Sequence, residues 1–179
     1  MKFQPQEIAG VFLIEPSPFQ DDRGVFRRHF CAEGFRKHGL PSIAVQANIS
    51  ENPHAFTLRG FHYQLPPHAE AKTLSCLRGK IHDIVVDVRP DSPTFMQWRA
   101  FDLDDVNRLS LHVPAGCANA FLTLVDHCLI QYYCSYPYTP AAERGIRYND
   151  PAFGFTWPAE PRLISDKDRS HPDFQRPKV

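Results

Sequence analysis

The chain has 179 residues, with 20 Lys and Arg against 20 Asp and Glu and a formal net charge of zero at neutral pH. Its charges are interleaved along the chain, which argues against a nucleic-acid partner, because such a partner needs a clustered basic surface. No apolar run approaches the roughly 20 residues of a membrane-spanning helix, and the first residues lack the apolar core of a signal peptide. We therefore expect a soluble, cytoplasmic protein without a membrane partner, folded as a single domain over residues 1–179.

The chain has five cysteines, an odd number, and none of them form a CxxC pair. Cys76, Cys128 and Cys134 lie inside apolar, strand-like runs, which predicts reduced thiols in the core. The spacing does not indicate a disulfide framework or a zinc knuckle.

Short runs rich in β-branched and aromatic residues alternate with 17 prolines and 9 glycines. This pattern is typical of strands separated by turns. In chain order the predicted strands are Ile8–Glu15, Val25–Phe30, Ile43–Ser50, Thr57–Gln64, Thr73–Leu77, Ile81–Val88, Gln97–Asp102, Leu109–Val113, Ala120–Val125 and Cys128–Tyr136. Short helices are predicted only at Ala32–His38 and Asp104–Arg108, and the tail after Trp157 is expected to be irregular. The even spacing, without a βαβ repeat, predicts an all-β antiparallel sandwich or barrel.

Two of the predicted strands mix polar and apolar side chains on one face. Regular alternation in residues 57–64 puts Arg59, Phe61 and Tyr63 on one face and, on the other, Leu58, Gly60, His62 and Gln64. The strand over residues 128–136 places five side chains on a common face: Cys128, Ile130, Tyr132, Cys134 and Tyr136. A barrel lined by His62, Gln64 and Tyr132 together with aliphatic side chains indicates a ligand cavity.

Four side chains could carry chemistry, and each also has a purely structural explanation. His62 could act as a general base, since free histidine titrates near neutral pH, or could be a satisfied part of the barrel wall. Lys72 could stabilise a developing negative charge, or could be a solvated lysine at a sheet edge. Arg59 could hold a phosphate with its planar guanidinium, or could form a surface ion pair. Tyr132 could deliver a proton, or could pack with its hydroxyl satisfied.

A series of motifs then runs in order from about Gly10 to Asp168: Leu58-Arg-Gly-Phe-His-Tyr-Gln64, Lys72, Asp91-Ser-Pro-Thr-Phe95, Pro114-Ala-Gly116, Tyr138-Thr-Pro140, Arg144-Gly-Ile-Arg-Tyr-Asn-Asp-Pro151, Trp157-Pro158 and Ser165-Asp-Lys-Asp168. Together they closely resemble the dTDP-4-dehydrorhamnose 3,5-epimerase family. The resemblance implies a cupin-like antiparallel β-barrel (a jelly roll) with the active site inside it. It also implies a homodimer paired through the N-terminal strands, and no metal or redox cofactor. Family members act on nucleotide-linked 4-keto-6-deoxy sugars in deoxysugar biosynthesis, for example on the way to rhamnose and lipopolysaccharide O-antigen.

The resemblance further implies a role for individual residues. His62 matches the base that removes a proton beside the C4 ketone, and Asp168 matches the carboxylate that orients this base. Lys72 matches the lysine that steadies the enolate oxygen, and Tyr132 matches the acid on the opposite face of the sugar. Arg59 and Arg23 match the arginines that hold the pyrophosphate. The positions that contact the nucleoside are Phe19, Gln46, Asn48 and Tyr138.

Two positions depart from the family pattern. Asn119 stands where the family has a second active-site histidine; asparagine can donate a hydrogen bond to a ketone or enolate oxygen, but it cannot shuttle a proton. We expect it to narrow or retune the reaction, and neutral drift is the alternative. Arg28 stands where the family commonly has glutamate near the nucleotide, which could indicate CDP or GDP in place of dTDP, or a different surface pair.

The sequence predicts an isomerase that epimerises C5, C3 or both carbons of the sugar. A 3,4-ketoisomerase of the same superfamily is the nearest alternative, and a non-catalytic sugar-nucleotide binder is another. A metal-dependent cupin oxygenase is disfavoured, because Gly60-Phe-His62 supplies one histidine where the first cupin motif has two and Asn119 replaces the ligand of the second motif.

Overall fold

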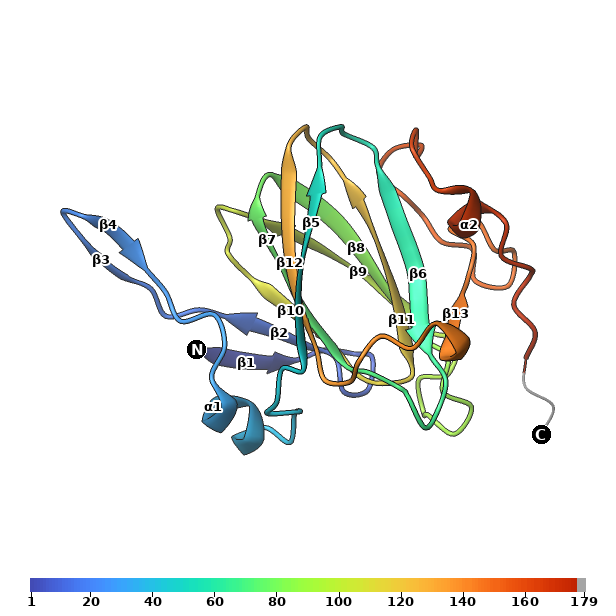
Figure 1. Ribbon diagram of the computed structural model, residues 1–179, viewed down its shortest axis with the longest axis horizontal. Coiled ribbons are helices and arrows are strands. Elements are labelled where there is room, and N and C mark those ends of the chain that lie inside the picture. Colours follow the sequence, from blue (N-terminus) through green and yellow to red (C-terminus); the bar gives the residue numbers. More distant parts are fainter. Residues whose placement is uncertain (177–179) are drawn as a thin grey trace.

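Two antiparallel sheets packed face to face make up most of the structure, a computed structural model that describes residues 1–176 (Figure 1). The first sheet has six strands, in the spatial order β1 (Lys2–Pro5), β2 (Phe12–Glu15), β10 (Ser110–Val113), β7 (Lys72–Arg78), β12 (Cys128–Cys134) and β5 (Gln46–Asn52). The second has five: β13 (Glu143–Gly145), β6 (Leu58–Gln64), β11 (Cys117–Thr123), β8 (Lys80–Asp87) and β9 (Trp98–Asp104). The predicted all-β antiparallel fold is confirmed.

A hydrophobic core fills one part of the space between the two sheets. Its fully buried members include Leu74 and Leu111 from the first sheet and Val85 and Leu103 from the second. Each of these strands alternates inward apolar residues with residues that face elsewhere, which is why it forms one side of a two-layer fold. Tyr132 packs on this core as a half-buried neighbour, at the boundary between the filled and the hollow parts of the barrel.

Aromatic side chains from the C-terminal segment cover the outer face of the second sheet. Phe61 on β6 is fully buried and stacks on Phe155 with ring centroids 4.4 Å apart. Trp98 on β9 and Trp157 donate their indole N–H groups to the carbonyls of Phe153 and Tyr148. The tail therefore runs along this sheet, which brings residues after Trp157 back to strand β6 (Figure 1).

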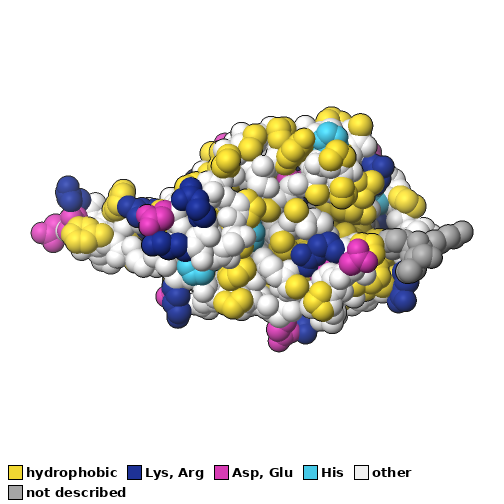
Figure 2. All heavy atoms as spheres, turned by 90° about the horizontal axis from the view of Figure 1, so that it is seen from below, with side chains coloured by type: hydrophobic (Ala, Val, Ile, Leu, Met, Phe, Trp, Pro, Cys, Tyr) yellow, Lys and Arg dark blue, Asp and Glu magenta, His cyan; other side chains and the backbone are white. Residues whose placement is uncertain are grey.

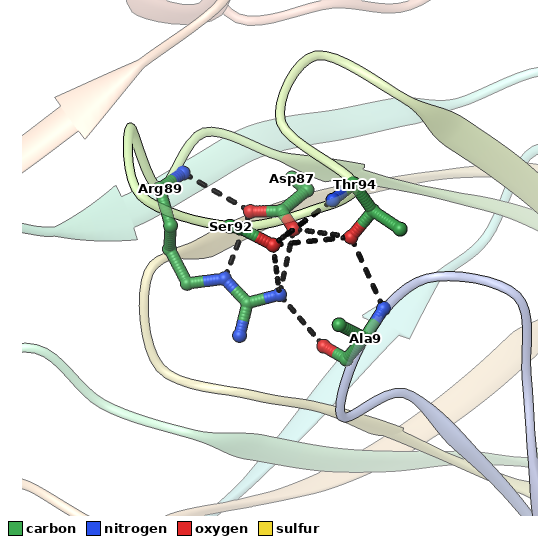
Figure 3. A network of polar contacts seen from close by, with 5 residues as sticks. All are labelled: Ala9, Asp87, Arg89, Ser92 and Thr94. Carbon is green, nitrogen blue, oxygen red and sulfur yellow. Dashed lines mark hydrogen bonds and ion pairs between the residues drawn. The ribbon is translucent and has the colours of Figure 1, made fainter.

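An ion-pair network fastens the end of β8 to the turn between β1 and β2 (Figure 3). The buried carboxylate of Asp87 accepts hydrogen bonds from Arg89, Ser92 and Thr94, and Arg89 also donates to the Ala9 carbonyl at 2.6 Å. Burial alone would raise the pKa of Asp87, but these three partners outweigh it and lower the pKa to about 2. The network holds a charge in place at one end of the fold.

A two-stranded hairpin, β3 (Phe19–Asp21) and β4 (Gly24–Phe26), projects far from the sheets as a separate arm (Figures 1 and 2). Phe19 and Phe26 on the arm are 62% and 74% exposed. Large aromatic side chains at this exposure leave apolar surface in water, which is typical of a contact site for another molecule.

Several predicted elements differ in the structure. The prediction of a helix at Asp104–Arg108 was wrong. Asp104 ends β9, and its carboxylate accepts hydrogen bonds from the backbone N–H groups of Val106 and Asn107, which stabilises a turn. The predicted strand at Val25–Phe30 is ordered as a strand only to Phe26. The predicted helix at Ala32–His38 is confirmed as α1 (Ala32–Lys37).

The tail after Trp157 was expected to be irregular, yet it contains a short helix, α2 (Asp166–Arg169). A 3-10 turn, η1 (Pro140–Ala142), comes earlier, before β13. The hydroxyl of Ser165 caps α2 by accepting from the backbone N–H of Asp168 at 3.1 Å. Within residues 1–176, neither α1 nor α2 is long or apolar enough to cross a membrane.

Candidate active site

A cavity of about 640 Å³ opens between the two sheets, beyond the packed core. A smaller lobe of about 350 Å³ adjoins it and shares three of its side chains, His62, Lys72 and Tyr132. Three of the five side chains proposed from the sequence for catalysis thus lie at the junction of the two lobes. Arg59 and Asn119 line the larger lobe with them.

His62 and Asp168 form a hydrogen-bonded pair in the larger lobe. The Nε2 atom of His62 lies 2.7 Å from the Oδ1 atom of Asp168, although 106 residues separate them. Burial alone would raise the pKa of Asp168, but the hydrogen bond and charge of His62 and the N–H of Gly60 outweigh it and lower the pKa. The carboxylate therefore stays ionised and holds the proton on Nε2, which leaves Nδ1 of His62 with the lone pair that a base needs.

Strand β6 contains a bulge that brings Arg59 onto the wall of the same cavity as His62. In the pairing of β11 with β6, Asn119 lies opposite His62 and Phe121 lies opposite Arg59. An advance of two residues along β11 therefore corresponds to three residues along β6, which is one extra residue in β6. Regular alternation had put Arg59 and His62 on opposite faces, and that expectation was wrong. Gly60 lies at the bulge with φ +113°, and an added Cβ would stand 2.5 Å from the Asn119 carbonyl oxygen. Its backbone N–H also donates to Asp168 at 3.2 Å.

The opposite wall of the cavity carries Lys72 and Tyr132, which lie on β7 and β12 of the first sheet. The Nζ atom of Lys72 donates to the His62 carbonyl at 2.9 Å and pairs with Glu70 at 3.1 Å, so the ammonium group reaches across to β6. Burial and the neighbouring Cys134 raise the pKa of Tyr132, and Arg59 offsets this only in part. The phenol is therefore protonated at neutral pH, and it lines the cavity from the sheet opposite that of His62.

Asn119 is tied to a buried carboxyl group that sequence analysis did not single out. Its amide Nδ2 donates to Oδ2 of Asp83 at 3.0 Å, and Asp83 is fully buried with its Oδ1 atom unpartnered. Burial raises the pKa of Asp83 well above its usual value, despite the hydrogen bond from Asn119 and the charge of Lys72. The signal in the sequence was a carboxylate inside the apolar strand Ile81–Val88, where charged residues rarely occur without a partner.

The smaller lobe contains the other predicted contacts on the barrel itself. Gln46, Asn48 and Tyr138 line it together with Glu143. The backbone N–H of Tyr138 donates to the Gln46 side chain at 2.6 Å, and its hydroxyl donates to Glu143 at 2.8 Å. Lys167 also pairs with Glu143. The lobe therefore offers polar groups and an aromatic ring within one pocket, which suits a sugar or a base.

Three predicted substrate-binding residues lie away from this cavity within the single chain. Phe19 and Arg23 are on the projecting arm, and Arg28 lies at its base with Phe26 in a different hollow. Arg23 is held by Asp21 on the same hairpin, 2.6 Å away. One chain by itself therefore does not bring the arm residues to His62.

A second histidine beside the His62–Asp168 pair was also missed. His171 follows α2, and its ring centroid lies 6.4 Å from that of His62. Burial lowers the pKa of His171, and the nearby His62 lowers it further. No local pattern marks His171, because only the return of the tail along β6 brings it to the cavity.

The chain is similar in sequence and in structure to nucleotide-sugar epimerases. The family model described as dTDP-4-dehydrorhamnose 3,5-epimerase matches residues 5–176. A dTDP-4-dehydrorhamnose 3,5-epimerase from Sinorhizobium fredii is 41% identical over 97% of this chain and 90% of its own length. The crystal structure of such an epimerase from Bacillus anthracis, with TDP and PPi bound, superposes with a TM-score of 0.93 at 36% identity, covering 97% of this chain and 99% of that one. A 3'-monoepimerase from Streptomyces bikiniensis in complex with dTDP-quinovose superposes with a TM-score of 0.89 at 36% identity, over 95% and 86% of the two chains.

Proposed function

Because the chain belongs to the dTDP-4-dehydrorhamnose 3,5-epimerase family, we propose that it inverts C5, C3 or both carbons of a dTDP-linked 4-keto-6-deoxy sugar with its own side chains alone. One observation carries this proposal: the His62–Asp168 pair and the Tyr132 phenol face one cavity from opposite sheets. A base and an acid on opposite sides of a bound ring are what inversion of a carbon requires.

The reaction follows from the protonation states of these groups. Nδ1 of His62 takes the proton from the carbon beside the C4 ketone, and Asp168 stabilises the imidazolium that forms. Electron density moves onto the ketone oxygen as an enolate, and the Lys72 ammonium stabilises that charge. Tyr132 then returns a proton to the carbon from the other face. Exchange of His62 and Tyr132 with solvent restores the starting state.

The charged diphosphate and the nucleoside need further partners. Arg59 lines the larger lobe and donates from its Nε atom to Asn52 at 2.8 Å, which leaves the two terminal nitrogens for a phosphate. Gln46, Asn48 and Tyr138 are proposed to contact the nucleoside in the smaller lobe. We infer dTDP as the nucleotide because the similar structures from B. anthracis and S. bikiniensis hold TDP and dTDP-quinovose.

We propose a homodimer in which the arm of one protomer reaches the cavity of its partner. Phe19, Arg23 and Arg28 match substrate-binding or nucleotide-end positions of the family, but their own chain holds them away from its cavity. The exposed aromatic side chains of the arm supply apolar surface for such a contact. The whole chain, residues 1–179, is proposed to act as one domain in this assembly, since the family match covers residues 5–176.

We also propose that the enzyme works in the cytoplasm, within the synthesis of deoxysugars for surface polysaccharides such as those with rhamnose. Its five cysteines are free thiols, and four of them are buried, which suits a reducing compartment. Cell fractionation with an antibody to the protein tests this location; recovery in a secreted or envelope fraction would contradict it.

Proton NMR of dTDP-4-keto-6-deoxyglucose with the enzyme in deuterated water tests the reaction itself. Deuterium at C3 and C5 is expected from a double epimerase, and deuterium at one carbon from a mono-epimerase. A shifted carbonyl without inversion would indicate a 3,4-ketoisomerase, and tight binding without exchange would indicate a non-catalytic binder.

His62→Ala is the control for this experiment. It should still bind dTDP, as isothermal titration calorimetry can show, but it should exchange no deuterium at either carbon. Exchange at the native rate in this variant would exclude His62 as the base. If the native enzyme leaves the dTDP sugar untouched, the same spectra with CDP and GDP sugars test whether Arg28 has changed the nucleotide.

A further inference from the structure

Three potential metal ligands meet at the wall of the cavity. His62, Asp168 and His171 each offer one ligand atom, and these atoms all lie within 4.8 Å of one another. The sequence motifs indicate His62 and Asp168 only as a catalytic pair. His171 adds a second imidazole, so the set becomes two histidines and one carboxylate.

The ring of His171 is placed against the strand next to His62. Strand β13 pairs Gly145 with His62, and a Cβ on Gly145 would stand 2.0 Å from the Nε2 atom of His171. The imidazole therefore occupies the space that a side chain at position 145 would fill. Its Nε2 atom is buried and has no hydrogen-bond partner among the described residues. A buried ring nitrogen without a partner is in a position to take a ligand.

The segment that carries His171 is anchored on both sides. Helix α2 precedes it, with Asp168 held by His62 and Gly60. Beyond it, the backbone N–H of Phe174 donates to Asp150 at 2.7 Å. The imidazole is thus set beside the catalytic pair by the fold.

We propose that His62, Asp168 and His171 bind a divalent transition-metal ion of the Zn²⁺ type, and that this ion inhibits the enzyme. Imidazole nitrogen and carboxylate oxygen are ligands that Zn²⁺ prefers, and three protein ligands leave one position open. Ligands at about 2.0–2.2 Å from Zn²⁺ lie roughly 3–4 Å apart, so binding requires the 2.7 Å contact between His62 and Asp168 to open and the three ligand atoms, which lie within 4.8 Å, to adjust around the ion. Two of the three ligands, His62 and Asp168, line the cavity.

The ion acts as an inhibitor because of what it occupies. His62 is the proposed base, and a histidine whose ring is bound to a cation does not accept a proton from the sugar. Asp168, engaged by the ion, no longer orients the imidazole. The site would make the enzyme sensitive to free zinc through a histidine that takes no part in the proposed reaction.

Calorimetric titration of ZnCl₂ into the full-length, untagged, EDTA-treated protein tests the proposal without reference to activity. The native protein should bind one Zn²⁺ at this site, and His171→Asn should weaken that binding about tenfold or more, since even outer-shell partners contribute about 10–100-fold. His82→Asn is the matched control, because His82 also pairs with a carboxylate at 2.7 Å, that of Asp102, but belongs to no group of three ligands within the described residues. It should bind Zn²⁺ like the native protein.

Equal Zn²⁺ affinity of the native protein and His171→Asn would overturn the proposal, as would the absence of any binding by the native protein. If His171→Asn does not fold, His171→Gln replaces it. Crystals soaked in ZnCl₂ give an independent answer: an anomalous peak between His62, Asp168 and His171 supports the site, and peaks only elsewhere contradict it. If the native protein proves active, EDTA should reverse its inhibition by Zn²⁺, and His171→Asn should keep its activity at zinc levels that inhibit the native enzyme.

Discussion

At the scale of single residues, His62 and Asn119 both line the cavity and each hydrogen-bonds to an aspartate. Asp168 faces the imidazole of His62, which can share its proton, and the carboxylate stays ionised. Asp83 accepts a hydrogen bond from the amide of Asn119, which cannot exchange a proton with it. Burial raises the pKa of the Asp83 carboxyl. The chain thus has one His–Asp pair and one Asn–Asp pair, and in the second the carboxyl group is buried behind the cavity-lining Asn119.

Asn119→His should restore the second pair. The new imidazole would lie beside Asp83, whose carboxylate could then stabilise an imidazolium, just as Asp168 does for His62. If Asn119 limits the enzyme to one carbon, the variant should incorporate deuterium at both C3 and C5 in the NMR experiment. Asn119→Gln, which keeps an amide, serves as the control. An unchanged product profile in Asn119→His would favour drift at this position.

Tyr132→Phe should separate removal of the proton from its return. His62 and Lys72 remain, so deuterium should still enter the substrate from solvent, but inversion should slow by about 10²–10⁴-fold because the acid is gone. Rates of exchange and of inversion, read from one NMR time course, check this. Tyr133→Phe on the same strand is a suitable control, since its residue is absent from the cavity lining. If both processes continue at native rates in Tyr132→Phe, another group is the acid.

At the scale of elements, the bulge in β6 decides which side chains the strand sends into the cavity. Gly60 permits it, because a side chain there would collide with the backbone of β11 and the φ of +113° strains any other residue. The bulge places Arg59 on the wall with His62, and it directs the Gly60 N–H at Asp168. Glycine usually weakens a strand, but here Gly60 allows the bulge that places these groups at the cavity.

Gly60→Ala should therefore destabilise the fold by about 2 kcal/mol or more, through backbone strain and the collision with Asn119. Urea unfolding followed by circular dichroism measures the free energy. Gly24→Ala is a matched control, because Gly24 has a φ of +120° but nothing lies within 4 Å of an added Cβ. The free energy of unfolding of Gly24→Ala should fall only by the cost of backbone strain. Equal free energies for the two variants would show that the close approach of β11 is unimportant.

The turn after β8 depends on one buried charge. The pKa of Asp87 is about 2 in the folded protein against an unfolded value of 3.8, so its ionised form contributes about 2 kcal/mol to stability. Because the folded pKa is the lower one, that contribution is complete above about pH 4 and is lost as the pH falls through about 2. The carboxylate in Figure 3 is thus an acid-sensitive link between β8 and the first two strands.

Asp87→Asn should lower the free energy of unfolding by about 3 kcal/mol or more at pH 6, because it leaves the guanidinium of Arg89 without its anion. The difference from the native protein should shrink as the pH approaches 2. Urea titrations at pH 6 and pH 3 measure both effects. Asp102→Asn, at a half-exposed carboxylate paired with Lys80, should cost less than about 1 kcal/mol. A pH-independent difference in Asp87→Asn would argue against the lowered pKa.

At the scale of the whole molecule, the arm and the barrel divide the predicted substrate contacts between them. The side chains proposed for catalysis line the cavity, whereas Phe19 and Arg23 lie on a hairpin that projects away from it (Figures 1 and 2). If the arm serves the cavity of a partner, each site takes its barrel from one protomer and its arm from the other.

Mixed dimers of His62→Ala and Arg23→Ala chains test this arrangement. Each homodimer should have little activity. In the heterodimer, one site combines an intact barrel with an intact arm, so about half of the native activity per dimer should return if the arms act across the interface. Differently tagged chains, refolded together and purified in tandem, provide the sample. A heterodimer that stays as inactive as the two parents would mean that each arm serves its own barrel, or none.

The sequence by itself determined the class of fold, the family and the polar side chains proposed for catalysis, because strand periodicity and short motifs are local properties of the chain. It also marked Asn119 as a departure. The tertiary structure decided what depends on distant segments: the bulge that brings Arg59 beside His62, the buried Asp83 behind Asn119, and the return of the tail that places Asp168 and His171 at β6. The same limit explains the helix wrongly predicted at Asp104–Arg108, where a side-chain-capped turn replaced the helix. These features arise from contacts between residues far apart in the sequence or from a competition between local hydrogen bonds, and neither leaves a periodic signal.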